Sequence, residues 1–479
     1  MWNTGRGYAI LSKQQLDEPL KVLSIKPDHR HDDRPAFALF LRSEGEVLAS
    51  SPCMDEESVD DDNPSRFPAA FSKGPVLYGA DGMMYVIITP HPKSQMCHKS
   101  SFVKPRWIIP SLENKTPGEL DWFNLSGCRL VGSLIQKDGH VHSLAVSGDL
   151  LYCGSQSKNI RVWKDSDEFS WFKSNSGLVK TIVIFSNRIF TGHQDGKIRI
   201  WTESKNANKR VGSLPTWQDM MKCTVNPRSY VRVRRRHKAL RIRHFDAVSC
   251  LSVHEEAGIL YSGSWDKTVK VWRIANSRCM ESVNVHDDAV NTVLAMGKGI
   301  LLTGSAEGTV KAWRREVSGP NTTRHVLVRV LLSQESAVTS LAVNSTSDVV
   351  YCGSSDGVVN FWTVTSRGQE MRHGGILWGH RTAVLCLATG GSRLVFCGSA
   401  DKSVRVWRRE KEGSGIVHTC LGTLTGHTGP IKCLAVMAED EDVAMPSSAS
   451  ASSDEGDRRW RLYSGSLDGS VRVWSVAEN

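Results

Sequence analysis

Apolar and polar residues alternate with a period of two in short runs along most of the chain. The clearest example is Tyr261–Trp272, where an apolar end, a Ser-Gly-Ser step and a turn at Asp266-Lys267 lead into Val-Lys-Val-Trp. Such alternation is typical of a strand with one buried face and one face in water. The stretch therefore predicts a half-buried β-hairpin, which needs neighbours of the same kind to cover its apolar face.

The chain contains seven copies of this hairpin pattern, and each ends in a tryptophan. They end at Trp163, Trp201, Trp272, Trp313, Trp362, Trp407 and Trp474. The intervals are 38, 71, 41, 49, 45 and 67 residues, and the short ones fit the period of about 40–45 residues of a four-stranded propeller blade. The two long intervals require insertions. The sequence thus predicts an all-β fold with a single seven-bladed β-propeller.

The propeller is expected over residues 126–479 as one closed unit. Its repeat units are expected at about 136–163, 176–201, 244–272, 286–313, 335–362, 379–407 and 426–474. The chain stops five residues after Trp474, which leaves the last blade without an outer strand. We expect strand 129–135 to complete that blade, which would close the ring and hide two sheet edges.

Residues 1–125 do not follow the repeat and are expected to form a mostly disordered N-terminal extension. They are rich in proline and scattered charge, with an acidic cluster at 55–62. The exception is 76–89, where two apolar runs flank Ala-Asp-Gly and predict a hairpin. His29, His31, Asp32 and Asp33 have the residue types of a metal cluster, but a solvated coil is favoured for a short charged tract.

Cysteine usage and hydropathy favour a reducing compartment. None of the 12 cysteines forms a CxxC pair, and six fall inside predicted strands, where a thiol behaves as a small apolar group: Cys153, Cys250, Cys352, Cys386, Cys397 and Cys433. No apolar run reaches the 18 or so residues of a membrane span, and the first thirty residues lack a secretory pattern. We expect the cytoplasm, the nucleus or both, with no membrane partner.

Polar residues recur in register within the repeats. An acid stands six residues before six of the tryptophans, whereas the first repeat has Ser157 there, and a histidine precedes the first strand in five repeats, at His140, His244, His286, His380 and His427. In this the chain resembles the WD40-repeat family. The resemblance implies a brace in which a His–Asp pair is linked through a strand hydroxyl to the tryptophan. The braces expected are His244, Ser262, Asp266 and Trp272 in the third blade, and His427, Ser464, Asp468 and Trp474 in the seventh.

A strongly basic insertion, 216–243, separates the second and third repeats. It carries +8 of the protein's net charge of +10, and its alternation at 231–234 and 241–243 predicts that part of it extends as strand. The candidate partner-binding residues are Arg232, Arg234, Arg235, Arg236, Lys238, Arg241 and Arg243. Three interpretations remain: a nucleic-acid or nuclear-import patch, a docking arm for an acidic protein or for the chain's own 55–62 cluster, and a solvated loop. The insertion most resembles that of the plant JINGUBANG-like branch of WD40 proteins.

A second insertion, 437–459, interrupts the seventh repeat. It is acidic and serine-rich, which predicts a disordered loop. Ser452 and Ser453 precede a run of acids, so both are candidate sites for an acid-directed kinase. An unmodified loop is the alternative.

The sequence contains no pattern that predicts catalysis. It has no phosphate-binding glycine loop, no metal-ligand spacing and no nucleophile elbow, and its Asp and His residues recur blade by blade, as bracing residues would. We expect no enzyme activity, no cofactor, and a monomeric scaffold that binds other proteins. The resemblance implies a regulatory role in transcription or signalling. The alternatives are a nucleic-acid-associated subunit acting through 216–243 and a cullin ubiquitin-ligase substrate receptor, although no repeat has the W-D-x-R ending typical of such receptors.

Overall fold

The computed structural model describes two parts of the chain. It describes residues 76–78 and 84–86, and residues 127–478 apart from 136–138, 177, 203–207, 235–236, 320–321, 345, 347, 366–369, 413–414 and 440–457. The chain divides into two compact units, Met1–Asn124 and Leu125–Asn479. In the first unit, β1 (Val76–Tyr78) pairs antiparallel with β2 (Met84–Val86), inside the segment where a hairpin is predicted.

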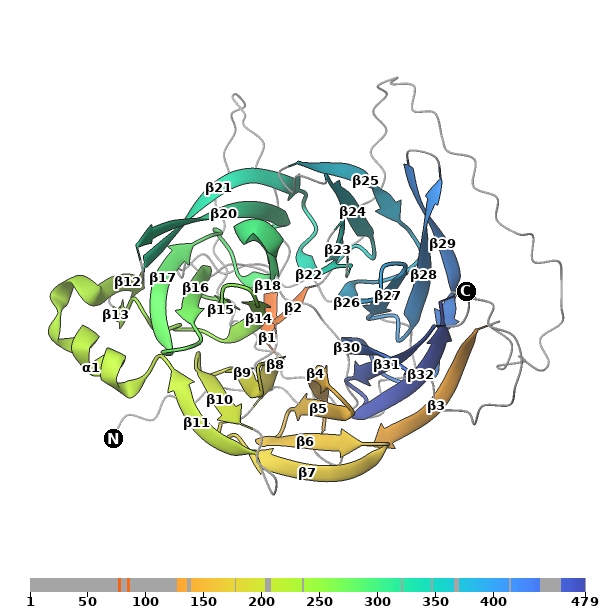
Figure 1. Ribbon diagram of the computed structural model, residues 1–479, viewed down its shortest axis with the longest axis horizontal. Coiled ribbons are helices and arrows are strands. Elements are labelled where there is room, and N and C mark those ends of the chain that lie inside the picture. The colour runs from red at the N-terminus through yellow and green to blue at the C-terminus, as the bar shows by residue number, and fades with distance from the viewer. Residues whose placement is uncertain are drawn as a thin grey trace, which may run out of the picture. The chain divides into compact units, whose positions relative to one another are not determined.

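The second unit is a seven-bladed β-propeller. Each blade is a four-stranded antiparallel sheet, and the seven sheets follow one another around a ring (Figure 1). The innermost strand of every blade contacts the innermost strands of the two neighbouring blades, so the ring is continuous. The predicted fold class is confirmed.

The first three blades take their strands in chain order. Blade 1 consists of β4 (Val141–Ser147), β5 (Leu150–Ser155), β6 (Asn159–Lys164) and β7 (Asp167–Lys173). Blade 2 consists of β8 (Val179–Phe185), β9 (Arg188–His193), β10 (Ile198–Thr202) and β11 (Lys209–Leu214). Blade 3 consists of β14 (Val248–His254), β15 (Ile259–Ser264), β16 (Thr268–Arg273) and β17 (Arg278–Asn284).

The next three blades repeat this arrangement. Blade 4 consists of β18 (Val290–Met296), β19 (Ile300–Ser305), β20 (Thr309–Gly319) and β21 (Thr322–Ser333), with the 3₁₀ turn η3 (Gly297–Gly299) between its first two strands. Blade 5 consists of β22 (Val338–Val343), β23 (Val349–Ser354), β24 (Val359–Val364) and β25 (Met371–Leu377). Blade 6 consists of β26 (Val384–Gly390), β27 (Leu394–Ser399), β28 (Val404–Glu412) and β29 (Gly415–Leu424).

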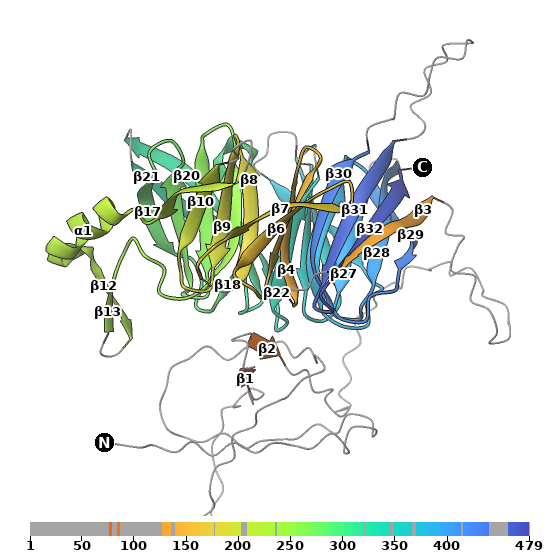
Figure 2. The ribbon, with the colours of Figure 1, turned by 90° about the horizontal axis from the view of Figure 1, so that it is seen from below.

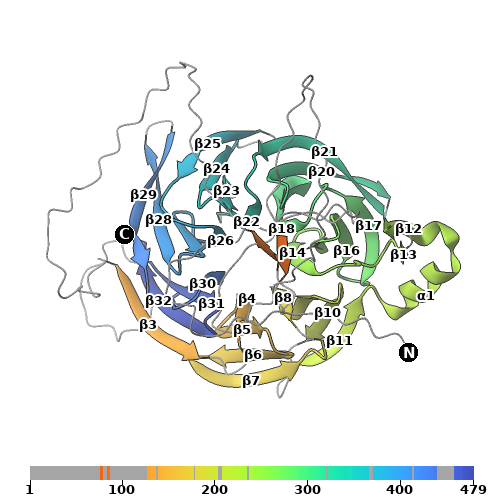
Figure 3. The same cartoon turned by 180° about the vertical axis from the view of Figure 1, so that it is seen from behind.

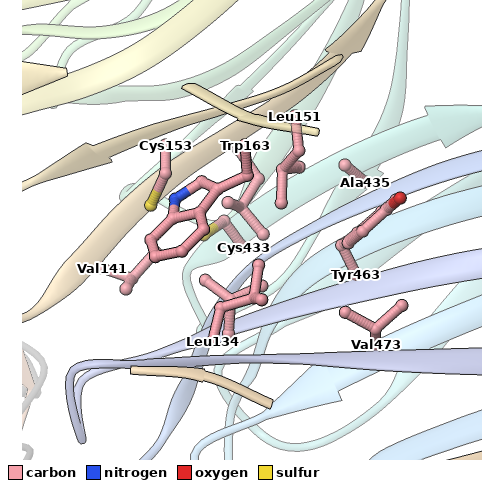
Figure 4. Packing of buried hydrophobic residues seen from close by; sticks show 11 residues of the cluster. Leu134, Val141, Leu151, Cys153, Trp163, Cys433, Ala435, Tyr463 and Val473 are labelled. Carbon is pink, nitrogen blue, oxygen red and sulfur yellow. The ribbon is translucent and has the colours of Figure 1, made fainter. Parts of the chain in front are cut away.

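Blade 7 combines both ends of the second unit. It takes β30 (Ile431–Ala438), β31 (Arg459–Ser466) and β32 (Ser470–Ala477) from the end of the chain, and β3 (Cys128–Ile135) as its outermost strand. Leu134 of β3 is buried with Val141 and Trp163 of blade 1 and Tyr463 of blade 7 (Figure 4). This seam joins strands from the two ends of the unit, so the ring is closed by packing and hydrogen bonds.

Every blade has a β-bulge at the start of its innermost strand. The pairing of the first two strands shifts between the first and third residues of the inner strand in all seven sheets. The second residue is left without a cross-strand partner, and a bulge redirects such a side chain. These seven bulge residues are His142, Lys180, Ser249, Asn291, Thr339, Leu385 and Lys432.

Between blades 2 and 3 the chain leaves the ring. The insertion folds as α1 (Trp217–Val225), the 3₁₀ turn η2 (Pro227–Ser229), and a hairpin of β12 (Tyr230–Arg234) with β13 (His237–Leu240). The side view and the view from behind both show this module outside the ring, beside β17 (Figures 2 and 3). It is therefore an appendage of blade 3 that leaves the seven sheets uninterrupted.

Candidate functional site

Blade 3 contains a buried chain of hydrogen bonds from the outer to the inner part of the sheet. Trp272 Nε1 donates to Ser262 Oγ over 2.9 Å, and Ser262 Oγ lies 2.9 Å from His244 Nε2. His244 Nδ1 lies 2.9 Å from Asp266 Oδ2. The assignment that satisfies each group has the hydroxyl donating to Nε2 and Nδ1–H donating to the carboxylate.

Burial and charge set the protonation states of the hydrogen-bonded side chains His244 and Asp266. Burial lowers the pKa of His244 by more than the nearby Asp266 carboxylate raises it. The imidazole therefore stays neutral. Burial alone would raise the pKa of Asp266, but His244, Lys270 and Thr268 outweigh it and lower the pKa to about 2. The result is a neutral histidine between a hydroxyl and an ionised acid, a fixed arrangement that suits bracing.

Blades 7 and 4 contain the same chain of side chains. In blade 7, His427 contacts Asp468 and Ser464 at 2.9 Å each, and Trp474 Nε1 donates to Ser464 Oγ over 2.9 Å. In blade 4 the equivalent side chains are His286, Glu307, Thr303 and Trp313. In blade 6, His380 contacts Asp401 at 2.9 Å, but its Nε2 meets the Cys397 carbonyl instead of a hydroxyl.

Blade 2 has a histidine in its brace that the sequence pattern did not reveal. Blade 2 has no histidine at the position before its first strand. His193, in the hairpin, is fully buried and lies 2.8 Å from Thr191 Oγ1, which accepts from Trp201 Nε1. The signal was present: eight residues before its tryptophan, blade 2 has His193 where the other six have serine.

Blades 1, 5 and 6 have a cysteine at the position of the bracing hydroxyl. These cysteines are Cys153, Cys352 and Cys397, and all three are fully buried. In blade 1 the Nε1 of Trp163 is buried without a hydrogen-bond partner among the described residues. Burial raises the pKa of the Cys352 and Cys397 thiols, so both remain protonated.

The repeats match a known family. A model of the WD40 family (WD domain, G-beta repeat) matches residues 129–164, 238–273, 325–363, 372–408 and 418–475. These segments are WD40 repeats. Three of the matched segments contain both a brace histidine and its acid partner, in blades 3, 6 and 7. The fold is thus a propeller that contains WD40 repeats, and WD40 propellers typically serve as protein-interaction scaffolds.

Two further proteins are similar to this chain. An uncharacterized WD repeat-containing protein of Schizosaccharomyces pombe is 27% identical over 128 residues, which cover 27% of this chain and 34% of the relative. The match thus spans about a third of the length of that relative. The crystal structure of the computationally designed Ika8 protein has a TM-score of 0.46 at 19% identity, covering 72% of this chain and 98% of the designed one.

The insertion of this propeller begins with a helix that sequence reasoning missed. Thr216 caps α1 by accepting from the Asp219 amide over 3.2 Å, and Asp219 lies in the first turn, where a negative charge is favourable. No residue of α1 is buried. Trp217, Met221 and Val225 are 74%, 48% and 82% exposed, and their spacing of four residues places them on one face.

The basic candidate residues lie on the hairpin and on the segment that follows it. Arg232 and Arg234 belong to β12 and Lys238 to β13, where Lys238 is exposed, while Arg235 and Arg236 lie outside the described residues. Part of the insertion extends as strand, as the alternation predicts, but this part is 230–234 and does not include 241–243. Arg241 and Arg243 are exposed and lie in a turn, since the strand has already ended at Leu240 and the chain must bend to enter blade 3.

This turn fastens the insertion to blade 3. Arg241 donates to the Ser282 carbonyl of β17 over 3.3 Å. Lys270 Nζ donates to the Arg241 carbonyl and to Ser282 Oγ, both over 2.8 Å. The basic appendage is therefore held against the outer strand of one blade, and it presents an apolar helical face together with an excess of positive charge.

Other predicted sites lie outside the residues that the structure describes. Ser452, Ser453, the acidic cluster 55–62 and the tract from His29 to Asp33 are outside the described residues. Within the described ranges, no group of three His, Cys, Asp or Glu residues could hold a metal ion. No helix in the described part of the chain is long and apolar enough to cross a membrane.

Proposed function

We propose that this propeller is a regulatory interaction scaffold that recruits a protein partner through the insertion 216–243. The observation that carries the proposal is the face of Trp217, Met221 and Val225, which a nine-residue helix without buried residues leaves exposed. Apolar anchors at this spacing are typical of a helix that lies in a groove of another protein. The basic hairpin beside the helix favours a groove with an acidic rim, which would speed encounter and orient the partner.

The proposal extends to the setting of the protein. The resemblance of the insertion to the plant JINGUBANG-like branch supports a role in transcription or signalling in the nucleus or cytoplasm of a plant cell, with the propeller acting as a monomer. Phosphorylation at Ser452 or Ser453 would add negative charge to the loop of blade 7. Intact-mass measurement on protein from its native source tests this modification, and a mass without phosphate removes it from the proposal.

A second candidate function is nucleic-acid association through the same insertion. It is favoured by one observation: Trp217 and Tyr230 are 74% and 36% exposed beside the basic residues, and exposed aromatic rings can stack on bases. A cullin substrate receptor has less support, because the residues after the seven tryptophans do not give the W-D-x-R ending.

The experiment that separates these functions compares three variants by affinity purification, with half of each sample treated with nuclease. The face variant carries Trp217→Ser, Met221→Ser and Val225→Ser. The charge variant replaces Arg232, Arg234, Arg235, Arg236, Lys238 and Arg243 by Ser and keeps Arg241, which anchors the insertion. The control variant carries Phe169→Thr, Trp171→Thr and Val211→Thr, which change exposed apolar residues on outer strands of blades 1 and 2.

A docking role predicts that one set of protein partners falls at least tenfold in both the face and the charge variants, remains in the control variant and survives nuclease. Partners that disappear with nuclease would give the nucleic-acid function precedence. A partner list that none of the variants changes would contradict the proposal and leave the insertion as a solvated appendage.

A further inference from the structure

Serines occupy the same register on the outermost strands of blades 7, 2 and 3, and each is paired with a cationic residue two positions before the tryptophan of its blade. The pairs are Ser133 with Arg472, Ser213 with Arg199, and Ser282 with Lys270. Directly paired residues of antiparallel strands point to the same side of the sheet. In blade 3 the pair is bonded, because Lys270 Nζ donates to Ser282 Oγ over 2.8 Å.

The hydroxyl of Ser213 in blade 2 has no such bond. Arg199 donates to Asp195 instead, over 2.7 Å from Nη2 and 3.2 Å from Nη1. In blade 3 the acid at this position, Asp266, is held by His244, whereas blade 2 has no histidine before its first strand, so its acid is left for the arginine. Within the described ranges nothing bonds to Ser213 Oγ, which leaves this hydroxyl available for modification.

Ser213 lies near the end of an exposed edge strand. β11 is the outermost strand of blade 2 and ends at Leu214, beside Pro215, after which the chain leads into α1 (Figure 1). Leu214 is the one buried residue of this strand. An edge strand is bonded along one side only, and the ends of strands open at low cost, so the segment 209–213 can enter the extended substrate groove of an enzyme.

The residues before Ser213 match the selectivity of a basic-directed serine kinase. Arg210 stands three residues before the serine and Lys209 four residues before it, and both are exposed. Carboxylates in the groove of such a kinase pair with an arginine at this distance. The same spacing from an arginine recurs at hydroxyls that are buried inside blades, at Thr191, Ser464 and Ser475. Ser213 therefore combines the spacing with an accessible strand.

We propose that Ser213 is a phosphorylation site for a basic-directed serine kinase, and that its phosphate weakens the binding of acidic partners to the insertion 216–243. The kinase transfers the γ-phosphoryl group of ATP to Ser213 Oγ. The bond to the leaving ADP oxygen breaks, a new P–O bond forms, and the hydroxyl proton passes to a carboxylate of the kinase. The effect on partners rests on the proposed docking function, whereas the modification itself does not.

The charge of the phosphate opposes the charge of the insertion. A phosphoserine carries about −1.5 to −2 at neutral pH, and the insertion carries +8. Ser213 precedes Thr216, the cap of α1, by three residues and Trp217 by four, and four extended residues span at most about 14 Å. An acidic rim that contacts this helix would therefore meet negative charge beside it, and like charges across an interface repel.

The first test is phosphorylation of the purified full chain by a kinase catalytic domain that selects arginine three residues before its serine, with the sites located by peptide mass spectrometry. We expect phosphate on Ser213 and a reaction about tenfold slower in Arg210→Gln, which removes the paired cation. Ser133 is the internal control, because it is exposed at the same register but follows Leu130 at that spacing. An unmodified Ser213, or equally fast reaction at Ser133, would overturn the assignment.

The second test measures the binding of a fluorescent poly-glutamate peptide, a probe for an acidic rim, to the phosphorylated and the unmodified full chain. We expect binding about threefold weaker after phosphorylation at about 50 mM salt, and a smaller difference at about 300 mM, because salt screens the charges. Ser213→Ala treated with the same kinase is the matched control and should bind as the unmodified chain does. Equal affinities of the two forms would overturn the effect on acidic partners.

These tests separate the failure of this inference from the failure of the docking function. The charge variant described above should bind the peptide weakly and still accept phosphate at Ser213. If affinity purification shows no partner that depends on the face of Trp217, while Ser213 is phosphorylated and the peptide binds more weakly, the docking function alone fails. If such partners exist and Ser213 stays unmodified, the phosphorylation site alone fails.

Discussion

At the scale of single residues, the braces show how exchanging one oxygen for sulfur changes the hydrogen bonding inside a blade. The position ten residues before the tryptophan is a hydroxyl in blades 2, 3, 4 and 7, where it accepts from the indole N–H. In blade 1 it is Cys153, and the indole N–H of Trp163 has no hydrogen-bond partner among the residues that the structure describes. A thiol is a weak acceptor, so the two residue types are not equivalent at this site.

A reciprocal exchange tests this difference. Cys153→Ser is expected to raise the free energy of unfolding by about 1 kcal/mol, because a hydroxyl can accept from Trp163 Nε1, and Ser262→Cys to lower it by about 1–3 kcal/mol, because it leaves buried donors poorly satisfied. Urea unfolding followed by tryptophan fluorescence measures both. Equal and small effects of the two exchanges would show that the hydroxyl contributes little.

Gly308 is a residue where the backbone allows no side chain. It has φ +82°, and an added Cβ would lie 1.9 Å from the Gln334 carbonyl oxygen, whose own amide donates to the Gly308 carbonyl over 3.1 Å. Gly308→Ala is expected to destabilise the propeller by about 1–3 kcal/mol through strain and displacement of that segment. Gly212→Ala, which meets no atom within 4 Å, is the control. A Gly308 variant as stable as the control would contradict the close approach.

At the scale of elements, the outermost strand of blade 7 determines how the ring is closed. β3 pairs along its length with β32, and Leu134 fills the seam between blades 7 and 1. Without β3, the edge of β32 would be unpaired, and an unpaired edge exposes backbone donors and acceptors. The sequence predicts that strand 129–135 supplies the outer strand that the last repeat lacks, and the structure pairs this segment with β32.

Replacing residues 129–135 by a Gly/Ser segment of equal length should therefore open the ring. We expect a lower melting temperature and increased binding of a dye for exposed apolar surface, because the seam around Leu134 loses its cover. The same replacement within 55–61, outside the propeller, is the control. A replaced chain that melts like the wild type would mean that β3 is not needed for closure.

The sequence contains signals for the helix α1, but the alternation of apolar and polar residues nearby favours strand and conceals them. Thr216 followed three residues later by Asp219 is a capping signal, and Trp217, Met221 and Val225 recur every four residues. The strand-like alternation and the positive charge of the surrounding segment conceal this signal. The hairpin at 230–240 follows from alternation at 231–234, whereas the turn at 241–243 depends on how the chain enters blade 3.

At the scale of the whole propeller, the buried histidines of several blades titrate in one direction. Burial lowers the pKa of His244 and His286, and that of His193 to about 3. An unfolded histidine has a pKa of about 6.5. Below that pH the unfolded chain binds protons that the folded chain does not bind. The free energy of unfolding therefore decreases as the pH falls.

The expected result is an unfolding midpoint in urea that decreases as the pH falls from 7 to 5. A second decrease should follow below about pH 4, where Asp266 and Glu307, each with a pKa of about 2, are ionised in the folded state while their unfolded counterparts become protonated. Equilibrium unfolding across this pH series is the measurement. A midpoint that stays constant from pH 7 to 5 would show that the histidines are protonated without cost.

The sequence by itself determined the number of blades and the residues of the braces in blades 3 and 7. Both depend on local patterns: alternation specifies a strand, and the fixed interval from Ser262 to Asp266 to Trp272 places three side chains on one hairpin. These features are set within a few residues of one another, so the repeat determines them blade by blade.

The tertiary structure alone decided which residues from distant parts of the chain meet. Leu134 and Tyr463 are about 330 residues apart and pack together because β3 completes blade 7. The exposure of α1 and the burial of His193 likewise depend on what each element packs against. Such relations follow from ring closure and from the bulges, which reorient single side chains that the strand period would place elsewhere.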